Sequence, residues 1–125
     1  MTATLKRARM TLTLAIDAIP HKETAFGRRA YTPATIRDYK QAFGLLVRSQ
    51  FRDPPLTGAL KVELRIYRAK KSATSRNFGD LDNLTKPILD ACTGALWLDD
   101  SQIVDLHVSK ASAPSPSVEI SVEVI

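Results

Sequence analysis

Alternation of apolar and polar positions predicts four β-strands in this chain. An apolar residue at every second position is the pattern of a strand with one buried face. The predicted strands cover residues 10–16, 60–67, 102–109 and 117–124. In the third strand we expect Val104, Leu106 and Val108 to point inward. Because the third and fourth strands are consecutive, we expect them to form an antiparallel pair.

Two segments show the 3.6-residue period of helices with one apolar face. The first begins at Thr32-Pro33, where a hydroxyl group caps the helix and proline takes the first helical position. The apolar side of this first helix includes Ile36 and Phe43. The second predicted helix covers residues 81–92. The element order β-α-β-α-β-β predicts an α+β fold, with two helices packed on one face of a small mixed sheet of about four strands.

Composition narrows the class of protein. The chain has 125 residues, of which 44% are apolar and 25% charged, as expected for one folded domain spanning residues 1–125. No apolar run reaches the roughly 18 to 20 residues of a membrane helix, and Asp17 interrupts the apolar stretch behind the basic N-terminus. The single cysteine, Cys92, cannot form an intrachain disulfide. We therefore expect a soluble, cytoplasmic protein with no membrane partner.

Charge is distributed unevenly along the chain. Residues 1–78 contain 16 Lys and Arg but 5 Asp and Glu, whereas residues 79–125 contain 2 and 8. The basic part indicates a polyanionic partner such as nucleic acid, and a divalent cation would let the acidic part approach it. A solvated surface with uneven charge is the alternative. The candidates for DNA phosphate contact lie in two loops: Lys22, Arg28, Arg29, Lys70, Lys71 and Arg76.

The second predicted helix begins with an acidic motif, GDLDNLTKP at residues 79–87. At 100° per residue, Asp82 and Lys86 share the polar face, and Asp80 precedes the first turn. A structural explanation is available, in which Asp80 caps the helix and the Asp82–Lys86 pair contributes about 0.2–0.5 kcal/mol. Pro87 weakens this explanation, because proline inside a helix removes a backbone hydrogen bond.

A second acidic pair, Asp99-Asp100, precedes the third predicted strand. If that strand lies beside the helix start, Asp80, Asp82 and Asp100 come together and repel one another unless a cation neutralises them. Oxygen ligands without histidine or cysteine suit Mg²⁺ or Mn²⁺. Such an ion activates water and stabilises a transferring phosphoryl group, and a nearby Lys86 would stabilise the transition state. A basic surface with a carboxylate-bound metal is typical of a nuclease.

The same residues resemble the RusA family of Holliday junction resolvases, which are crossover junction endodeoxyribonucleases. The resemblance is carried by DLDNLTK at residues 80–86, LDA at 89–91 and LWLDDSQIV at 96–104. It implies a RusA-like domain that acts as a homodimer on branched DNA. It further implies that four-way junctions are resolved by paired symmetric nicks, with Mg²⁺ or, as a substitute, Mn²⁺, in DNA recombination and repair.

The resemblance also implies roles for single residues. Asp80, Asp82 and Asp100 would be the metal-binding catalytic carboxylates, and Lys86 the catalytic lysine, whereas Asp99 is either a further site residue or a support of its turn. Gly79 departs from the family, whose members often have a basic residue or proline there. Two other functions stay open, a metal-dependent nuclease on other branched DNA and a non-catalytic nucleic-acid-binding module.

Four further residues have weaker signals. Trp97 lies between two leucines and Cys92 on the apolar helix face, so both are expected in the core. His107 alternates away from the apolar side of its strand and is expected at the surface. Phe78 lies in a basic loop, where it either packs against the core or wedges into an open DNA junction.

Overall fold

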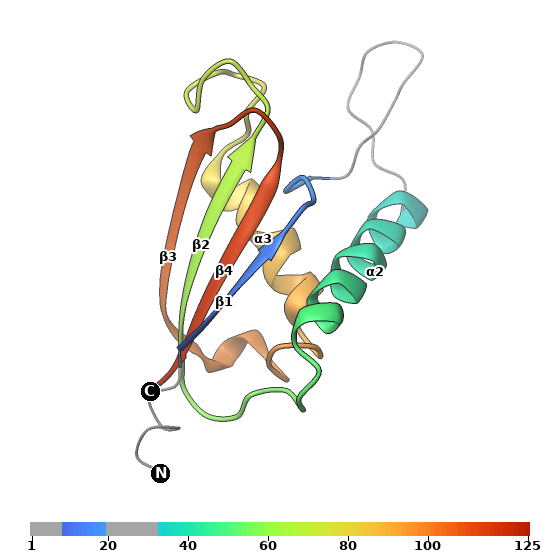
Figure 1. Cartoon of the computed structure of the whole chain (residues 1–125), viewed down its shortest axis with the longest axis vertical. Coiled ribbons are helices and arrows are strands. Elements are labelled where there is room, and N and C mark those ends of the chain that lie inside the picture. Colours follow the sequence, from blue (N-terminus) through green and yellow to red (C-terminus); the bar gives the residue numbers. More distant parts are fainter. Residues whose placement is uncertain (1–8, 20–32) are drawn as a thin grey trace.

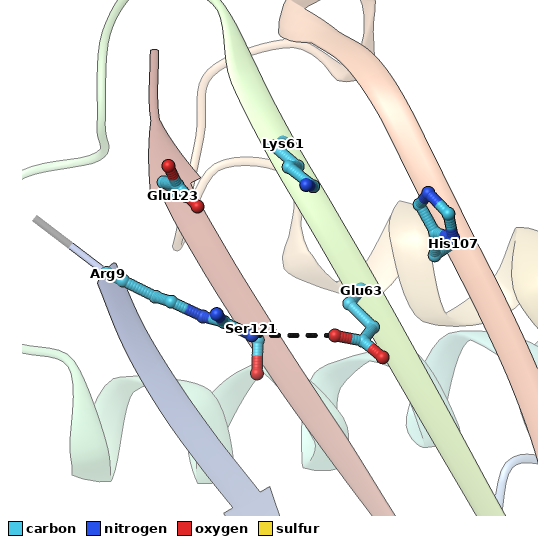
Figure 2. A pocket seen from close by; sticks show the side chains of 6 residues that line it. All are labelled: Arg9, Lys61, Glu63, His107, Ser121 and Glu123. Carbon is cyan, nitrogen blue, oxygen red and sulfur yellow. Dashed lines mark ion pairs between the residues drawn. The ribbon is translucent and has the colours of Figure 1, made fainter. Parts of the chain in front are cut away.

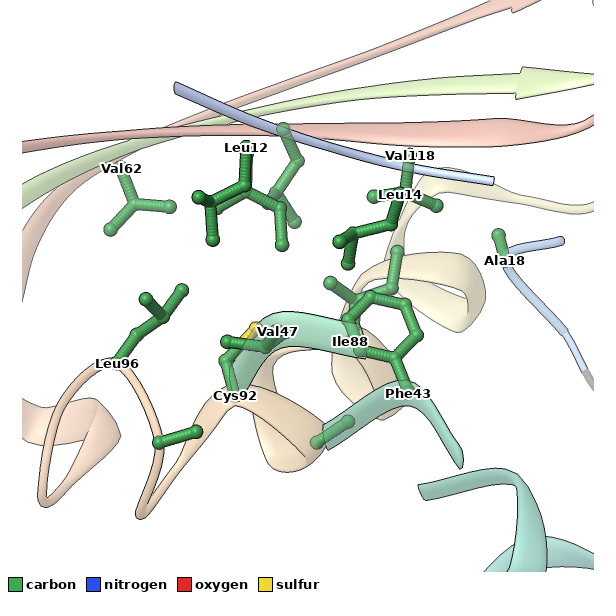
Figure 3. Close-up of a cluster of buried hydrophobic side chains, with 14 of the residues drawn as sticks. Leu12, Leu14, Ala18, Phe43, Val47, Val62, Ile88, Cys92, Leu96 and Val118 are labelled. Carbon is green, nitrogen blue, oxygen red and sulfur yellow. The ribbon is translucent and has the colours of Figure 1, made fainter. Parts of the chain in front are cut away.

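The computed structural model describes residues 9–19 and 33–125. Its single sheet has the strand order β1-β4-β2-β3, and the helices α2 and α3 lie on one face of it (Figures 1 and 3). The elements are β1 (Arg9–Leu14), α2 (Pro33–Gln50), β2 (Leu60–Arg68), α3 (Leu81–Cys92), β3 (Ile103–Ser112) and β4 (Ser117–Val124). The predicted α+β fold and its element order are confirmed. The predicted cap Thr32 lies outside the described residues.

The predicted pairing of the last two strands is wrong. β4 lies between β1 and β2 and is antiparallel to both, whereas β3 runs parallel to β2 at the edge. The reason is that α3 links β2 to β3 as a crossover, which places the two strands side by side in the same direction. The chain then passes over the end of β2, where the Ala113 amide donates a hydrogen bond to the Arg68 carbonyl at 3.0 Å.

The core lies between the sheet and the two helices (Figure 3). β2 and β4 alternate as predicted, so that Val62 and Val118 face inward, toward the helices that contribute Val47 (α2) and Ile88 (α3) to the same core. Trp97 is also fully buried, as predicted. These contacts hold the helices against the two central strands and fix the position of α3, which carries the acidic motif.

Cys92 belongs to the same core, as predicted. Burial raises the pKa of its thiol from 9.0 to about 12, because the thiolate would lose its hydration there. The thiol is therefore neutral at physiological pH, which agrees with an inert packing role.

Three apolar side chains that the pattern assigns to the core are partly exposed at its margin. Leu106 is paired with Val62 and so faces the helix side of the sheet, yet it is 41% exposed because β3 is an edge strand. Val104 is 63% exposed at a register shift between β2 and β3, the position of a β-bulge. Ile36 of α2 is 38% exposed. Alternation predicted the direction of Leu106 correctly but not how far the helices cover it.

Among the described residues, no helix is both long enough and apolar enough to cross a membrane.

Candidate functional site at the start of helix α3

Asp80 stands at the N-cap position of α3, but its side chain does not cap the helix. Its backbone is extended, with φ −79° and ψ 148°, and its carboxylate makes no capping hydrogen bond. The first turn is instead closed by the backbone, because the Asp80 carbonyl accepts from the Leu84 amide at 3.0 Å. The exposed Asp80 carboxylate therefore has no capping role. It lies at the N-terminal end of a helix, where the helix dipole favours negative charge.

Asp82 and Lys86 lie one turn apart on the exposed side of α3, as the helical period predicts. Across the described part of the chain, the ion pairs include none between these two side chains. The ion pair on this helix is instead formed by Asp90 with Lys40 of α2, at 3.5 Å. The structural explanation of the acidic motif therefore accounts neither for Asp82 nor for Lys86.

Asp99 and Asp100 have different local roles. Asp99 caps the short 3₁₀ turn Asp100–Gln102, where its Oδ1 accepts from the Ser101 amide at 2.9 Å. Hydrogen bonds from the backbone and side chain of Ser101, and then one with Asp100, lower the pKa of Asp99. Gln102 completes the turn by accepting the Asp99 amide with its Oε1 at 3.1 Å. Asp99 thus supports the turn that presents the exposed Asp100, which begins this turn rather than strand β3.

A hollow of about 370 Å³ between α3 and β3 is lined by three of the four predicted catalytic residues. Asp82 and Lys86 line it from the helix, Asp100 lines it from the 3₁₀ turn, and Leu106 and Val108 form its apolar side on β3. These polar residues come from α3 and from the 3₁₀ turn that follows it in the chain, and the β2-α3-β3 crossover places both beside one hollow. Asp80 is not part of the wall of this hollow.

The candidate ligands for a metal ion are the carboxylates of Asp80, Asp82 and Asp100. Within residues 9–19 and 33–125, no three His, Cys, Asp or Glu side chains are close enough to hold a metal, so convergence of Asp80, Asp82 and Asp100 on one ion stays a prediction. Mg²⁺ keeps several waters and is usually held by one or two carboxylates together with substrate phosphates. Two carboxylates that face one hollow, Asp82 and Asp100, fit that requirement.

A second hollow, of about 460 Å³, lies on the other side of α3, between this helix and α2. Ile19, Ile36 and Tyr39 provide much of its apolar wall, and Asp82 and Lys86 reach it as well. This explains why Ile36 is less buried than its helical position predicts. Asp82 and Lys86 therefore stand on a ridge of α3 between two hollows.

The basic residues predicted to contact DNA are only partly described. Lys22, Arg28 and Arg29 lie outside the described residues. In the loop between β2 and α3, Lys71 and Arg76 are exposed and Lys70 is half-buried. These three remain candidates for phosphate contact. The loop that carries them leads directly into Asp80.

Arg68 and Phe78 behave differently from the rest of this basic loop. Arg68 is 3% exposed and pairs with Asp17, with 2.6 Å between Nε and Oδ1. The signal that would have identified it is the alternation of β2, because residues 60, 62, 64 and 66 are all buried and Arg68 is next in that series. Phe78 is fully buried, so the hypothesis that it wedges into a junction is wrong, and packing explains it.

The opposite face of the sheet carries a polar surface (Figure 2). Arg9, Lys61, Glu63, His107 and Glu123 surround a hollow of about 230 Å³ on it. Arg9 and Glu63 form an ion pair at 3.5 Å, and positive and negative groups are mixed. His107 is exposed, as predicted. Positive and negative side chains are therefore mixed on this face, whereas the candidate carboxylates lie on the face that α3 covers.

Comparison with known proteins identifies the family of this chain. A family model described as endodeoxyribonuclease RusA matches residues 17–123. The uncharacterised protein YqaN of Bacillus subtilis is 29% identical over 106 residues, which are 72% of this chain and 75% of that protein. The crossover junction endodeoxyribonucleases RusA of Escherichia coli K12 and of Enterobacteria phage 82 are each 31% identical over 83 residues, 66% of this chain and 65% of theirs.

The chain thus matches slightly less than two thirds of the length of the two named resolvases. The family match is broader, because it extends from the end of β1 to β4 and includes the whole segment from Asp80 to Asp100. The chain belongs to the RusA family of endodeoxyribonucleases.

Proposed function

We propose that this chain is a Mg²⁺-dependent, structure-specific endodeoxyribonuclease that resolves four-way DNA junctions by paired symmetric nicks. Mn²⁺ would substitute for Mg²⁺, and the activity would serve DNA recombination and repair in the cytoplasm. The observation that carries the proposal is that Asp82, Lys86 and Asp100 face one hollow. The capping and ion-pair roles that would otherwise explain Asp80 and Asp82 are not seen. Family membership and the names of the two resolvases add support.

In this proposal Asp80, Asp82 and Asp100 hold the metal. When bound, the ion supplies positive charge for the phosphate oxygens and lowers the pKa of water. The chain's own contribution is to present Asp82 from α3 and Asp100 from the 3₁₀ turn at one hollow, with Asp80 at the N-cap position just before the helix. Lys86 then donates a hydrogen bond to the oxygen that gains negative charge as water attacks phosphorus and the sugar oxygen leaves.

We further propose that the active species is a homodimer. A four-way junction has two equivalent strands to cut, whereas one chain has one set of Asp82, Lys86 and Asp100. A twofold-symmetric pair of chains would place one site at each strand. Symmetric nicking therefore follows from symmetry as well as from the family resemblance.

A substrate panel tests the proposed function. Labelled four-way junction, flap, fork and linear duplex are incubated with the protein in Mg²⁺ and, separately, in EDTA. The proposal predicts that Mg²⁺ supports cutting of the four-way junction above all other substrates, and that EDTA stops cutting without stopping binding. Faster cutting of flaps or forks would favour a nuclease for other branched DNA. Binding without cutting in either Mg²⁺ or Mn²⁺ would favour a non-catalytic binding module.

The basic loop yields a separate prediction on binding. Replacing Lys70 and Lys71 with alanine should make the dependence of junction affinity on salt shallower, because each phosphate contact contributes about 0.9 to the log–log slope on duplex DNA. The measurement is a titration of junction binding over a range of salt concentrations in EDTA. Lys61→Ala is the control, since Lys61 lies on the opposite, polar face of the sheet. An unchanged slope and affinity would place the DNA on another surface.

A further inference from the structure

Three consecutive backbone carbonyls immediately precede Asp80, and two cationic side chains from neighbouring strands bind them. Arg68, at the end of β2, donates through Nη1 to the carbonyl of Asn77 at 3.2 Å and to that of Phe78. Lys110 of β3 donates through Nζ to the carbonyl of Gly79 at 2.8 Å. The segment 77–79 is therefore held from two strands before the helix begins.

Packing makes this segment rigid in other ways as well. The buried Phe78 ring lies against both cations, with 5.8 Å from its centroid to the Arg68 guanidinium carbon and 5.3 Å to Lys110 Nζ. Gly79 has φ +106°, a conformation that favours glycine. A Cβ on Gly79 would also meet the Leu84 side chain at 3.0 Å. The backbone conformation and the close Leu84 side chain thus both favour glycine at this position.

The Lys110–Gly79 hydrogen bond joins the two elements that carry the candidate carboxylates. Gly79 is covalently followed by Asp80 and, two residues later, Asp82 on α3. Lys110 lies on β3, which continues directly from the 3₁₀ turn that begins with Asp100. The hollow that Asp82 and Asp100 share lies between these same two elements. A bond from the far end of β3 to the residue before Asp80 therefore anchors the start of α3 against β3.

We propose that Lys110 is a positioning residue for the nuclease reaction: through the Gly79 carbonyl it fixes the start of α3, and with it Asp80 and Asp82, against β3. This inference rests on the proposed function of the site. Arg68 supports the same segment, but it is itself buried and pairs with the half-buried Asp17, so its replacement would also break that ion pair. Lys110 is half-buried and on an edge strand, so its replacement is the cleaner test.

The test compares wild type with Lys110→Met, which keeps an unbranched stem of similar length but removes the donor. We expect single-turnover cleavage of a four-way junction at saturating enzyme to fall by at least about tenfold, and more Mg²⁺ to be needed for half-maximal rate. Junction affinity in EDTA and its salt dependence should not change. Hydrogen–deuterium exchange of residues 77–84 should become faster in the absence of metal and DNA.

Two variants serve as controls. Lys110→Arg should recover part of the rate, since a guanidinium can still donate to the Gly79 carbonyl. Lys61→Met removes a lysine from the other face of the sheet and should leave every readout unchanged. Weaker junction binding with a shallower salt slope in Lys110→Met would show a DNA contact and overturn the inference. Wild-type cleavage and exchange in this variant would also overturn it, while leaving the proposed function standing. An inactive wild-type protein would instead refute the proposed function.

Discussion

Asp82→Asn should abolish junction cleavage while junction binding is retained or becomes tighter. The amide has nearly the shape of the carboxylate but lacks its charge, so it is a poor ligand for a hard cation. We expect the single-turnover rate to fall by about a thousandfold or more, which corresponds to about 4 kcal/mol of lost transition-state stabilisation. Binding should not suffer, because a negative charge that repels DNA phosphates has been removed.

The measurement pairs single-turnover cleavage in Mg²⁺ with junction binding in EDTA. Asp38→Asn is the matched control, because Asp38 is also an exposed aspartate on a helix, α2, and does not line the hollow. It should cut at the wild-type rate. Wild-type cleavage by Asp82→Asn would show that the site has been assigned to the wrong residues.

Lys86→Ala should lower the single-turnover rate by at least about a hundredfold, a loss typical of removing one transition-state donor. Its melting temperature should change little, because an exposed lysine without an ion pair to Asp82 buries little surface. An exposed helix ion pair would contribute only about 0.5 kcal/mol to stability in any case. Lys86→Arg should recover little activity, because a planar guanidinium cannot place a compact charge at the same point.

The matched control is Lys40→Ala. Lys40 is also a lysine beside α3, where it pairs with Asp90, but it lines the hollow toward α2 and not the one that contains Asp100. Its loss should leave the cleavage rate near that of wild type. A Lys86→Ala protein that is fully active but less stable would return Lys86 to a structural role and leave the aspartates as the catalytic candidates.

Local patterns predicted the helices and strands well, because the spacing of apolar residues within a short segment determines which kind of element it forms. Residues 81–92 form the predicted helix, and the phase of 100° per residue places Asp82 and Lys86 together on its exposed side. Pairing of strands is a non-local property, and adjacency in sequence gave the wrong partner for β4. The same reason explains the exposure of Leu106. The direction of its side chain follows from the local alternation, whereas the extent to which α3 covers it depends on the tertiary fold.

The candidate site could be predicted from the sequence to a similar extent. The types and spacing of Asp82, Lys86 and Asp100 pointed to one chemistry, but only the β2-α3-β3 crossover places all three on one hollow. Arg68 and Lys110 were missed as supports of the segment before Asp80. A basic residue that binds backbone carbonyls has the same one-letter pattern as one that faces solvent, and only burial and contacts in the fold distinguish them.

The most direct test of a symmetric, two-site resolvase is the product formed from a supercoiled plasmid that extrudes a cruciform. Two nicks within the lifetime of one complex give linear DNA, whereas a single nick releases the supercoiling, removes the cruciform and leaves an open circle. The account predicts that the wild-type protein with Mg²⁺ converts the plasmid directly to linear product with paired, symmetrically placed ends. Accumulation of open circles that are never linearised, or no cutting at all, would contradict it.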